Sequence, residues 1–245
     1  MPLESKVFSG TKKLHDEIEK KPFLKRYNQK VHTLTDHYRH LTQLLPIYQA
    51  LEKKLNNPHF FLQLPEALQY LLTLSEKIKT DLQFLEFHVS KKYKNQVLQS
   101  TKNYVEHINQ LDMKKNEIEI LSHFAVRIWG DLHGGQALKD YTLDLFKRER
   151  IYIDNEKGVG FYCHSKEALK IFNHQVDALQ FDDENKKNLI HFCNDSFGAH
   201  IKMVEELEST RRLETQNHCN LFQKAVLVGA TVAGIALAGV TIANR

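Results

Sequence analysis

Residues 127–139 read RIWGDLHGGQALK, and they place three glycines within six residues of a segment otherwise built from helix-forming residues. A glycine in a helix interior costs about 1 kcal/mol relative to alanine. Gly130 and Gly134 are four residues apart and therefore share one face of the helix, while Gly134-Gly135 provides a point for a kink. The pattern predicts a helix whose backbone lies against something flat or bulky. The alternative interpretation is close packing against another helix.

A second segment near the amino terminus, TKKLHDEIE at residues 11–19, carries a histidine suited to binding iron. His15 and Glu19 are one helical turn apart, on the same face as Ile18. A neutral imidazole binds iron through one ring nitrogen while a nearby carboxylate orients the other N–H. The alternative is an exposed histidine–glutamate pair. Together with a glycine-faced second helix, this histidine supplies the two sides that a flat heme requires.

Composition limits the class of protein. The chain has 245 residues, with 10 Gly and 5 Pro, which disfavours an all-β or loop-rich fold. A net charge of +4 is too small and too diffuse to indicate a nucleic-acid partner, so none is expected. Three cysteines form no disulfide framework and favour a reducing compartment, and the first ten residues contain no signal peptide.

Apolar residues recur with helical spacing along almost the whole chain, and no long linker divides it. The prediction is a single all-α domain with one strand-like patch at residues 151–164. The expected helices are a short one ending near Pro22, a long one over 23–55, a run from Pro65 toward His88, and segments at 95–111, 114–148, 165–179 and 183–214.

The carboxyl-terminal run AVLVGATVAGIALAGVTIA, at 225–243, contains no charge. Nineteen helical residues span roughly 28 Å, close to the ~30 Å of a bilayer core. The pattern predicts a catalytic domain at 1–214, a tether at 215–224 and a transmembrane anchor at 225–243. Small residues every fourth position in this run are compatible with a homodimer through the tail. A buried alanine-rich helix is the alternative.

Several common catalytic motifs are absent from the sequence. There is no H-E-x-x-H, no Glu-x-x-His pair, no glycine-rich phosphate loop and no G-x-S-x-G. These absences argue against a zinc protease, a ferritin-like di-iron bundle, a nucleotide-binding fold and an α/β-hydrolase.

The glycine segment and the histidine segment together resemble the biliverdin-producing type of the heme oxygenase family. That family carries G-D-L-S-G-G-Q on its distal helix, which stands here as GDLHGGQ at 130–136, and a T-x-x-x-H-x-x-x-E segment matched by Thr11, His15 and Glu19. The resemblance runs in order over about residues 5–214. Further matches are IYQALE at 47–52, Phe161, Phe197 and EEL at 205–207. Membrane-bound members of the family end in a hydrophobic anchor.

The resemblance implies a heme-oxygenase-like helical bundle in which heme is sandwiched between a proximal helix and a kinked distal helix. It implies that His15 is the iron ligand, with Glu19 near its second ring nitrogen. Gly130 and Gly134 would cover the distal face of heme, bind it and leave room for O2. Phe197 is expected to contact heme.

Further site roles also follow from the resemblance. It implies that Asp131 anchors a distal water network that delivers protons, and that Tyr48 and Arg127 support this network. Lys12 matches a basic position that meets a heme propionate. His123 and His200 also align with the family, and a core or helix-packing role is expected for both.

The implied reaction converts heme, O2 and electrons into biliverdin, CO and ferrous iron, with heme as both substrate and oxygen-activating centre. The electrons would come from an external donor, either an NADPH-dependent reductase or a ferredoxin. The implied location is a membrane, with the protein anchored by its tail and the catalytic domain in the cytoplasm. A non-catalytic protein that binds or stores heme is the alternative.

The sequence also departs from the family pattern. His133 replaces the serine of the distal motif, and we expect it to point away from iron. Ala125 replaces a tyrosine of the distal helix. Phe8, Leu169 and Asn173 stand where members of the family place basic contacts to the propionates. A weaker propionate clamp leaves the biliverdin isomer open, although the distal helix favours the α isomer.

Overall fold

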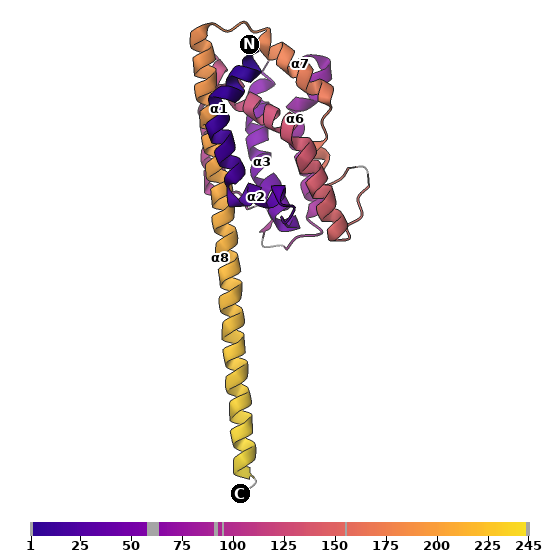
Figure 1. Ribbon diagram of the computed structural model, residues 1–245, viewed down its shortest axis with the longest axis vertical. Helices are drawn as coiled ribbons and strands as arrows, with labels where there is room; N and C mark the ends of the chain where they lie inside the picture. Colours follow the sequence, from indigo (N-terminus) through magenta and orange to yellow (C-terminus); the bar gives the residue numbers. More distant parts are fainter. Residues whose placement is uncertain (1, 58–63, 91–92, 95, 155, 244–245) are drawn as a thin grey trace. The chain divides into compact units, whose positions relative to one another are not determined.

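The computed structural model describes residues 2–57, 64–90, 93–94, 96–154 and 156–243, and it describes side chains as far as residue 216 except at 166 and 214. This part of the chain is helical, as predicted, and contains no strand (Figure 1). In chain order the helices are α1 Leu3–Lys20, α2 Pro22–Asn28, α3 Leu34–Leu55, the 3-10 helix η1 Glu66–Leu72, α4 Leu74–Leu85, α5 Gln99–Gln110, α6 Glu117–Arg148, the 3-10 turn η3 Gly160–Tyr162, α7 Lys166–Asp177 and α8 Asp183–Ala243.

The chain divides into two compact units, Met1–Glu206 and Leu207–Arg245. The first unit contains α1 to α7 and the first part of α8, and it holds all the predicted site residues. The predicted boundaries at 214 and 224 fall within the single long helix α8, which belongs to both units.

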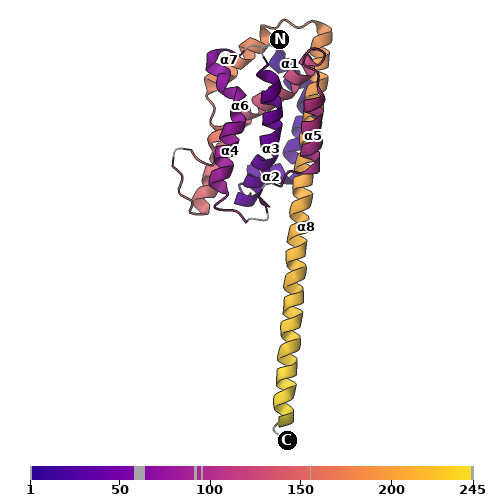
Figure 2. The same cartoon turned by 180° about the vertical axis from the view of Figure 1, so that it is seen from behind.

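Helix α3 lies at the centre of the first unit and packs against α4, α5 and α6. All residues from 36 to 44 are buried, which is typical of a helix covered on every side. Helices α1, α2 and α6 are seen in front of α3 in Figure 1, and α4 and α5 are seen from the opposite side in Figure 2. The ribbon of α6 is continuous and changes direction along its length, as expected for the distal helix.

The predicted helix over 23–55 is wrong, because the chain breaks between α2 and α3. Lys30 adopts a left-handed backbone conformation with φ 57°, which ends α2. Thr33 then starts α3 with a capping box: its hydroxyl accepts the N–H of Asp36 at 3.1 Å, and the Asp36 carboxylate accepts the N–H of Thr33 at 3.0 Å. Because the periodicity of apolar residues continues across the break, periodicity alone does not reveal where α2 ends and α3 begins.

The strand-like patch at 151–164 is a loop that ends in the 3-10 turn η3. The buried carboxylate of Asp81, on α4, accepts backbone N–H groups from Gly158, Gly160 and Phe161 at 2.8, 3.0 and 2.8 Å. Gly158 has φ +84°, and a Cβ there would come within 2.8 Å of Phe146. These contacts replace the sheet partners that a strand would need.

The predicted membrane anchor at 225–243 lies outside the residues whose side chains are described. Its backbone belongs to helix α8. Within the described part of the chain, no helix combines the length and the apolar character needed to cross a bilayer.

Candidate active site

A cavity of about 590 Å³ lies in the first unit between α1 and α6. This volume falls within the ~300–1,000 Å³ typical of small-molecule sites. Most of the predicted site residues line it. These are His15 and Glu19 from α1, Arg127, Gly130, Asp131 and Gly134 from α6, and Phe197 from α8. The fold therefore brings together residues that are more than 100 positions apart in the chain.

Two glycines give α6 a bare face toward this cavity. A Cβ built at Gly130 or Gly134 would meet nothing within 4 Å, so neither glycine serves to pack α6 against another helix. Gly135 is different, because its Cβ would lie 3.6 Å from the backbone oxygen of Tyr162. The cavity, and not a neighbouring helix, is what the Gly130–Gly134 face borders.

His15 faces the cavity from α1. Its Nδ1 lies 3.9 Å from Oε1 of Glu19, and its ring contacts Phe8 and Phe197 at centroid distances of 5.6 and 6.0 Å. The side chain is 35% exposed, so the ring is held by neighbours yet accessible from the cavity. With Nδ1 on the side of Glu19, Nε2 is the candidate atom for binding a metal.

The carboxyl group of Asp131 lies beside the glycine face and is held by a buried tyrosine. The Tyr48 hydroxyl donates a hydrogen bond to Oδ2 of Asp131. Burial raises the pKa of Asp131 to about 7, although this hydrogen bond and the charge of Arg127 act in the opposite direction. Burial and the nearby Asp131 raise the pKa of Tyr48 well above its usual range. Asp131 can therefore both accept and release a proton near neutral pH.

Arg127 extends this polar group toward two histidines. Its Nη1 donates to Nδ1 of His200 at 2.6 Å, and the His200 ring stacks on His40 with centroids 6.1 Å apart. Burial lowers the pKa of His40 to about 3 and that of His200 well below its usual value, so both imidazoles are neutral at pH 7. Sequence reasoning assigned His200 to the core and did not single out His40, yet both line the cavity.

Several buried polar atoms of the lining have no hydrogen-bond partner among the described residues. They are Nε of Arg127, Nε2 of His200, both ring nitrogens of His40, and the hydroxyls of Tyr27 and Tyr162. Buried polar atoms are almost always paired in folded proteins. Water or a bound molecule in the cavity would supply the missing partners, which favours a ligand site over an ordinary packing defect.

His133, the unusual residue of the distal motif, pairs with Glu4 near the start of α1. Its Nε2 lies 2.6 Å from Oε1 of Glu4, and the other oxygen of Glu4 accepts a hydrogen bond from Nδ2 of Asn173. Asn173 in turn accepts from Nε1 of Trp129 at 2.8 Å. These contacts join α1, α6 and α7. They engage the side chain of Asn173, which stands where members of the family place a basic contact to a propionate.

Two predicted site residues do not line the cavity. Tyr48 contacts the lining residue Asp131 through the hydrogen bond from its hydroxyl, and its role toward a proton network stays a prediction. Lys12 is on the surface, 63% exposed, where its Nζ pairs with Asp16 at 3.0 Å. Its role toward a propionate stays a prediction.

Comparison with known proteins identifies the family to which this arrangement belongs. A family model described as Heme oxygenase matches residues 1–206. The chain belongs to the heme oxygenase family. The heme oxygenase of Porphyra purpurea is 28% identical over 218 residues, which cover 85% of this chain and 87% of that protein. The heme oxygenase 1 of Nostoc is 24% identical over 213 residues, covering 84% and 86%.

Solved structures of the heme oxygenase family share the fold. The heme oxygenase-1 of Synechocystis, determined in complex with heme, gives a TM-score of 0.70 at 22% identity and covers 90% of this chain and 100% of that one. The heme oxygenase of Leptospira interrogans gives the same TM-score and identity, covering 84% and 100%. The predicted all-α heme oxygenase fold is confirmed.

Proposed function

We propose that this chain is a heme oxygenase that binds heme in the cavity between α1 and α6 and converts it, with O2 and electrons, into biliverdin, CO and ferrous iron. The observation that carries the proposal is the bare face of Gly130 and Gly134 across a cavity that His15 also lines. Bound heme supplies both the iron that activates O2 and the ring that is cleaved.

His15 and the two glycines provide the two sides of the site. His15 would bind the iron through Nε2, with Glu19 near Nδ1 to orient the ring. On the other side, the absence of side chains at Gly130 and Gly134 allows a flat ring and a small gas molecule to lie next to the helix backbone. A larger residue at either position would project into the same space.

Asp131 provides the proton chemistry that separates cleavage from simple heme binding. Its carboxyl group has a pKa of about 7, and Tyr48 holds it in place. General acid catalysis is most efficient when the pKa of the donor is close to the working pH. A protein that only stored heme would have no need for a titrating carboxyl beside the glycine face.

Few positive charges are available to hold the two propionates of heme. Among the described lining residues, Arg127 carries the permanent positive charge, whereas Phe8 is apolar and Asn173 is engaged with Glu4 and Trp129. A weaker clamp allows heme to rotate in its plane. We propose the α isomer of biliverdin as the main product, because the glycine face also directs the oxygen.

We further propose that the electrons come from an external reductase or ferredoxin and that the uncharged run 225–243 anchors the protein to a membrane, with the catalytic domain in the cytoplasm. The length and composition of the run support the anchor. Its small residues at every fourth position support a homodimer through the tail.

The experiment that tests the proposed function compares the wild type with Asp131→Ala. Hemin affinity, measured by absorption titration, should be nearly the same in both proteins, because no iron ligand is lost. Biliverdin yield per heme with a reductant should fall strongly in the variant, and Asp131→Asn should be intermediate, because an amide still orders water. A normal biliverdin yield from Asp131→Ala would show that protons arrive by another route.

A further inference from the structure

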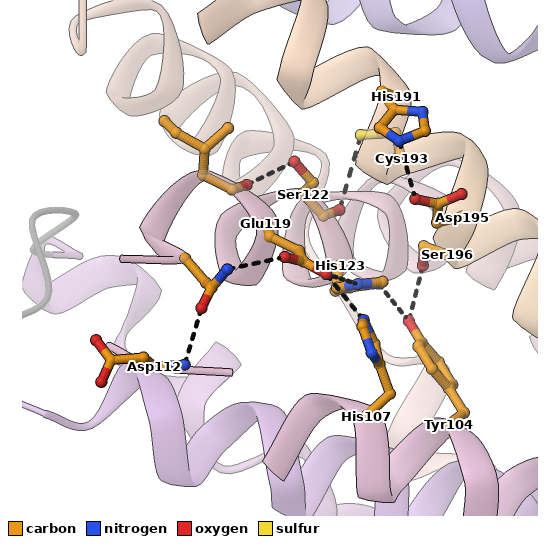
Figure 3. A network of polar contacts seen from close by, with 12 residues as sticks. Tyr104, His107, Asp112, Glu119, Ser122, His123, His191, Cys193, Asp195 and Ser196 are labelled. Carbon is orange, nitrogen blue, oxygen red and sulfur yellow. Dashed lines mark hydrogen bonds and ion pairs between the residues drawn. The ribbon is translucent and has the colours of Figure 1, made fainter. Parts of the chain in front are cut away.

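A second cluster of chemistry-bearing side chains lies on α5 and the first turns of α6, apart from the cavity. It consists of His107 on α5 and of Glu119 and His123 on α6 (Figure 3). The Nε2 of His107 is 2.8 Å from Oε1 of Glu119, and the Nε2 of His123 is 3.9 Å from that same oxygen. All three ligand atoms lie within 4.8 Å of one another. None of these residues lines the heme site.

His123 is the most informative member of the cluster. Its side chain is only 1% exposed, and its Nε2 has no hydrogen-bond partner among the described residues. The 3.9 Å to Glu119 is too long for a hydrogen bond. A buried nitrogen without a hydrogen bond costs free energy, and this one is aimed at the pair formed by His107 and Glu119 (Figure 3). The closer pair formed by His107 and Glu119 leaves this nitrogen without a hydrogen bond.

The opposite ring nitrogen of His123 is already engaged. Its Nδ1 lies 2.9 Å from the hydroxyl of Tyr104, which lies 2.9 Å from Oγ of Ser196. When Nδ1–H donates to Tyr104 and Tyr104 donates to Ser196, Nε2 carries a lone pair. Metal-binding histidines in proteins are held in the same way, with the second ring nitrogen bonded to a neighbour.

We propose that His107, Glu119 and His123 form a binding site for a divalent transition metal of the zinc type. Zinc binds imidazole nitrogen and carboxylate oxygen at about 2.0–2.1 Å, so two ligands of one tetrahedral ion lie about 3.3 Å apart. The separations of 2.8 and 3.9 Å lie on either side of this value, and all three ligand atoms lie within 4.8 Å of one another, so metal binding would require side-chain rotations that bring the more distant atoms closer. His107 is 48% exposed, which gives a metal ion a way in and leaves room for water as the fourth ligand.

The surroundings of the cluster support this assignment. The second carboxylate oxygen of Glu119 accepts a hydrogen bond from Nδ2 of Asn116 at 3.2 Å, which leaves Oε1 to face the two histidines. Glu119 and His123 are four residues apart on one face of α6, and His107 comes from the neighbouring helix. A bound ion would therefore tie α5 to α6 and stabilise the first unit independently of heme.

The test uses the full-length protein, freed of metal with a chelator and then titrated with Zn²⁺ by calorimetry. The wild type should bind one Zn²⁺ at this cluster. His107→Gln, which changes a half-exposed side chain, and Glu119→Gln, which keeps the size of the side chain, should each weaken that binding by about 100-fold or more. The same titrations with Co²⁺ should give a visible ligand-field spectrum that both substitutions abolish.

His191→Gln is the matched control. His191 also lies next to a carboxylate, with Nε2 3.6 Å from Oδ2 of Asp195, but it belongs to no three-residue cluster in the part of the chain that the structure describes (Figure 3). Its substitution should leave Zn²⁺ affinity and the Co²⁺ spectrum unchanged. The proposal is overturned if the wild type takes up no Zn²⁺, or if its affinity is the same in His107→Gln, Glu119→Gln and His191→Gln.

Discussion

Replacing Gly130 or Gly134 with alanine should make the empty protein more stable and the enzyme less active. A Cβ at either position meets nothing within 4 Å, so the methyl group causes no clash in the empty protein. Each substitution then adds the helix propensity of alanine, about 1 kcal/mol. In a protein of this size that corresponds to an increase in Tm of about 2–4 °C, and of about 4–8 °C for the double variant.

The same methyl group should oppose heme binding or turnover, because it projects into the cavity that heme would fill. Adding a methyl group to a filled site costs about 1–3 kcal/mol, which corresponds to a roughly 5- to 150-fold loss. Thermal unfolding of the heme-free variants by circular dichroism measures the first effect. Hemin titration and biliverdin yield measure the second.

Gly198→Ala provides the matched control for this prediction. Gly198 lies in α8 within the first unit, its Cβ would also meet nothing within 4 Å, and it does not line the cavity. Its substitution should raise Tm by a similar amount and leave biliverdin formation unchanged. A lower Tm of the heme-free protein in Gly130→Ala and Gly134→Ala, or full heme affinity and full biliverdin yield in these variants, would refute the prediction.

Three further predictions address the ligand, the effect of acid and the tail. His15→Ala should bind hemin weakly and recover part of its activity with added imidazole, and an unchanged hemin spectrum would move the ligand role to another histidine. Between pH 8 and 5.5 the free energy of unfolding, measured with urea, should fall by about 4 kcal/mol. Burial lowers the pKa of six histidines, which therefore bind protons more readily once the chain is unfolded: His32, His37, His40, His123, His164 and His200. This loss of stability exceeds the gain from the raised pKa of Asp131 and Asp81, and a flat profile would contradict the prediction. A truncated chain that ends near Asn220 should stay soluble and active, whereas the full chain should partition into detergent. Equal partitioning of the two proteins would rule out the anchor.

The parts of the site that could be predicted from the sequence depend on local spacing. Gly130 and Gly134 lie four residues apart, and so do His15 and Glu19, so one helical turn places each pair on a single face. The hydrogen bonding of Thr33 and Asp36 is also local, and T-x-x-D is a signal that could have revealed the break before α3. Periodicity alone masked that signal.

The parts that could not be predicted depend on packing between distant segments. The pair formed by Arg127 and His200 joins residues 73 positions apart, and no spacing rule anticipates it. The burial expected for His123 is confirmed, but its approach to His107 depends on how α5 packs against α6. Likewise, Glu4 reaches His133 only because the start of α1 lies beside α6.

We propose that this chain cleaves heme that is bound between His15 and the Gly130–Gly134 face. The most direct measurement is a time course of absorption spectra of the purified protein, loaded with one equivalent of hemin and given a reductant in air, with the product identified by chromatography. We expect the Soret band to disappear as biliverdin forms and CO is released. A hemin complex that is reduced but keeps its Soret band, with no biliverdin recovered, would show that the protein binds heme without cleaving it.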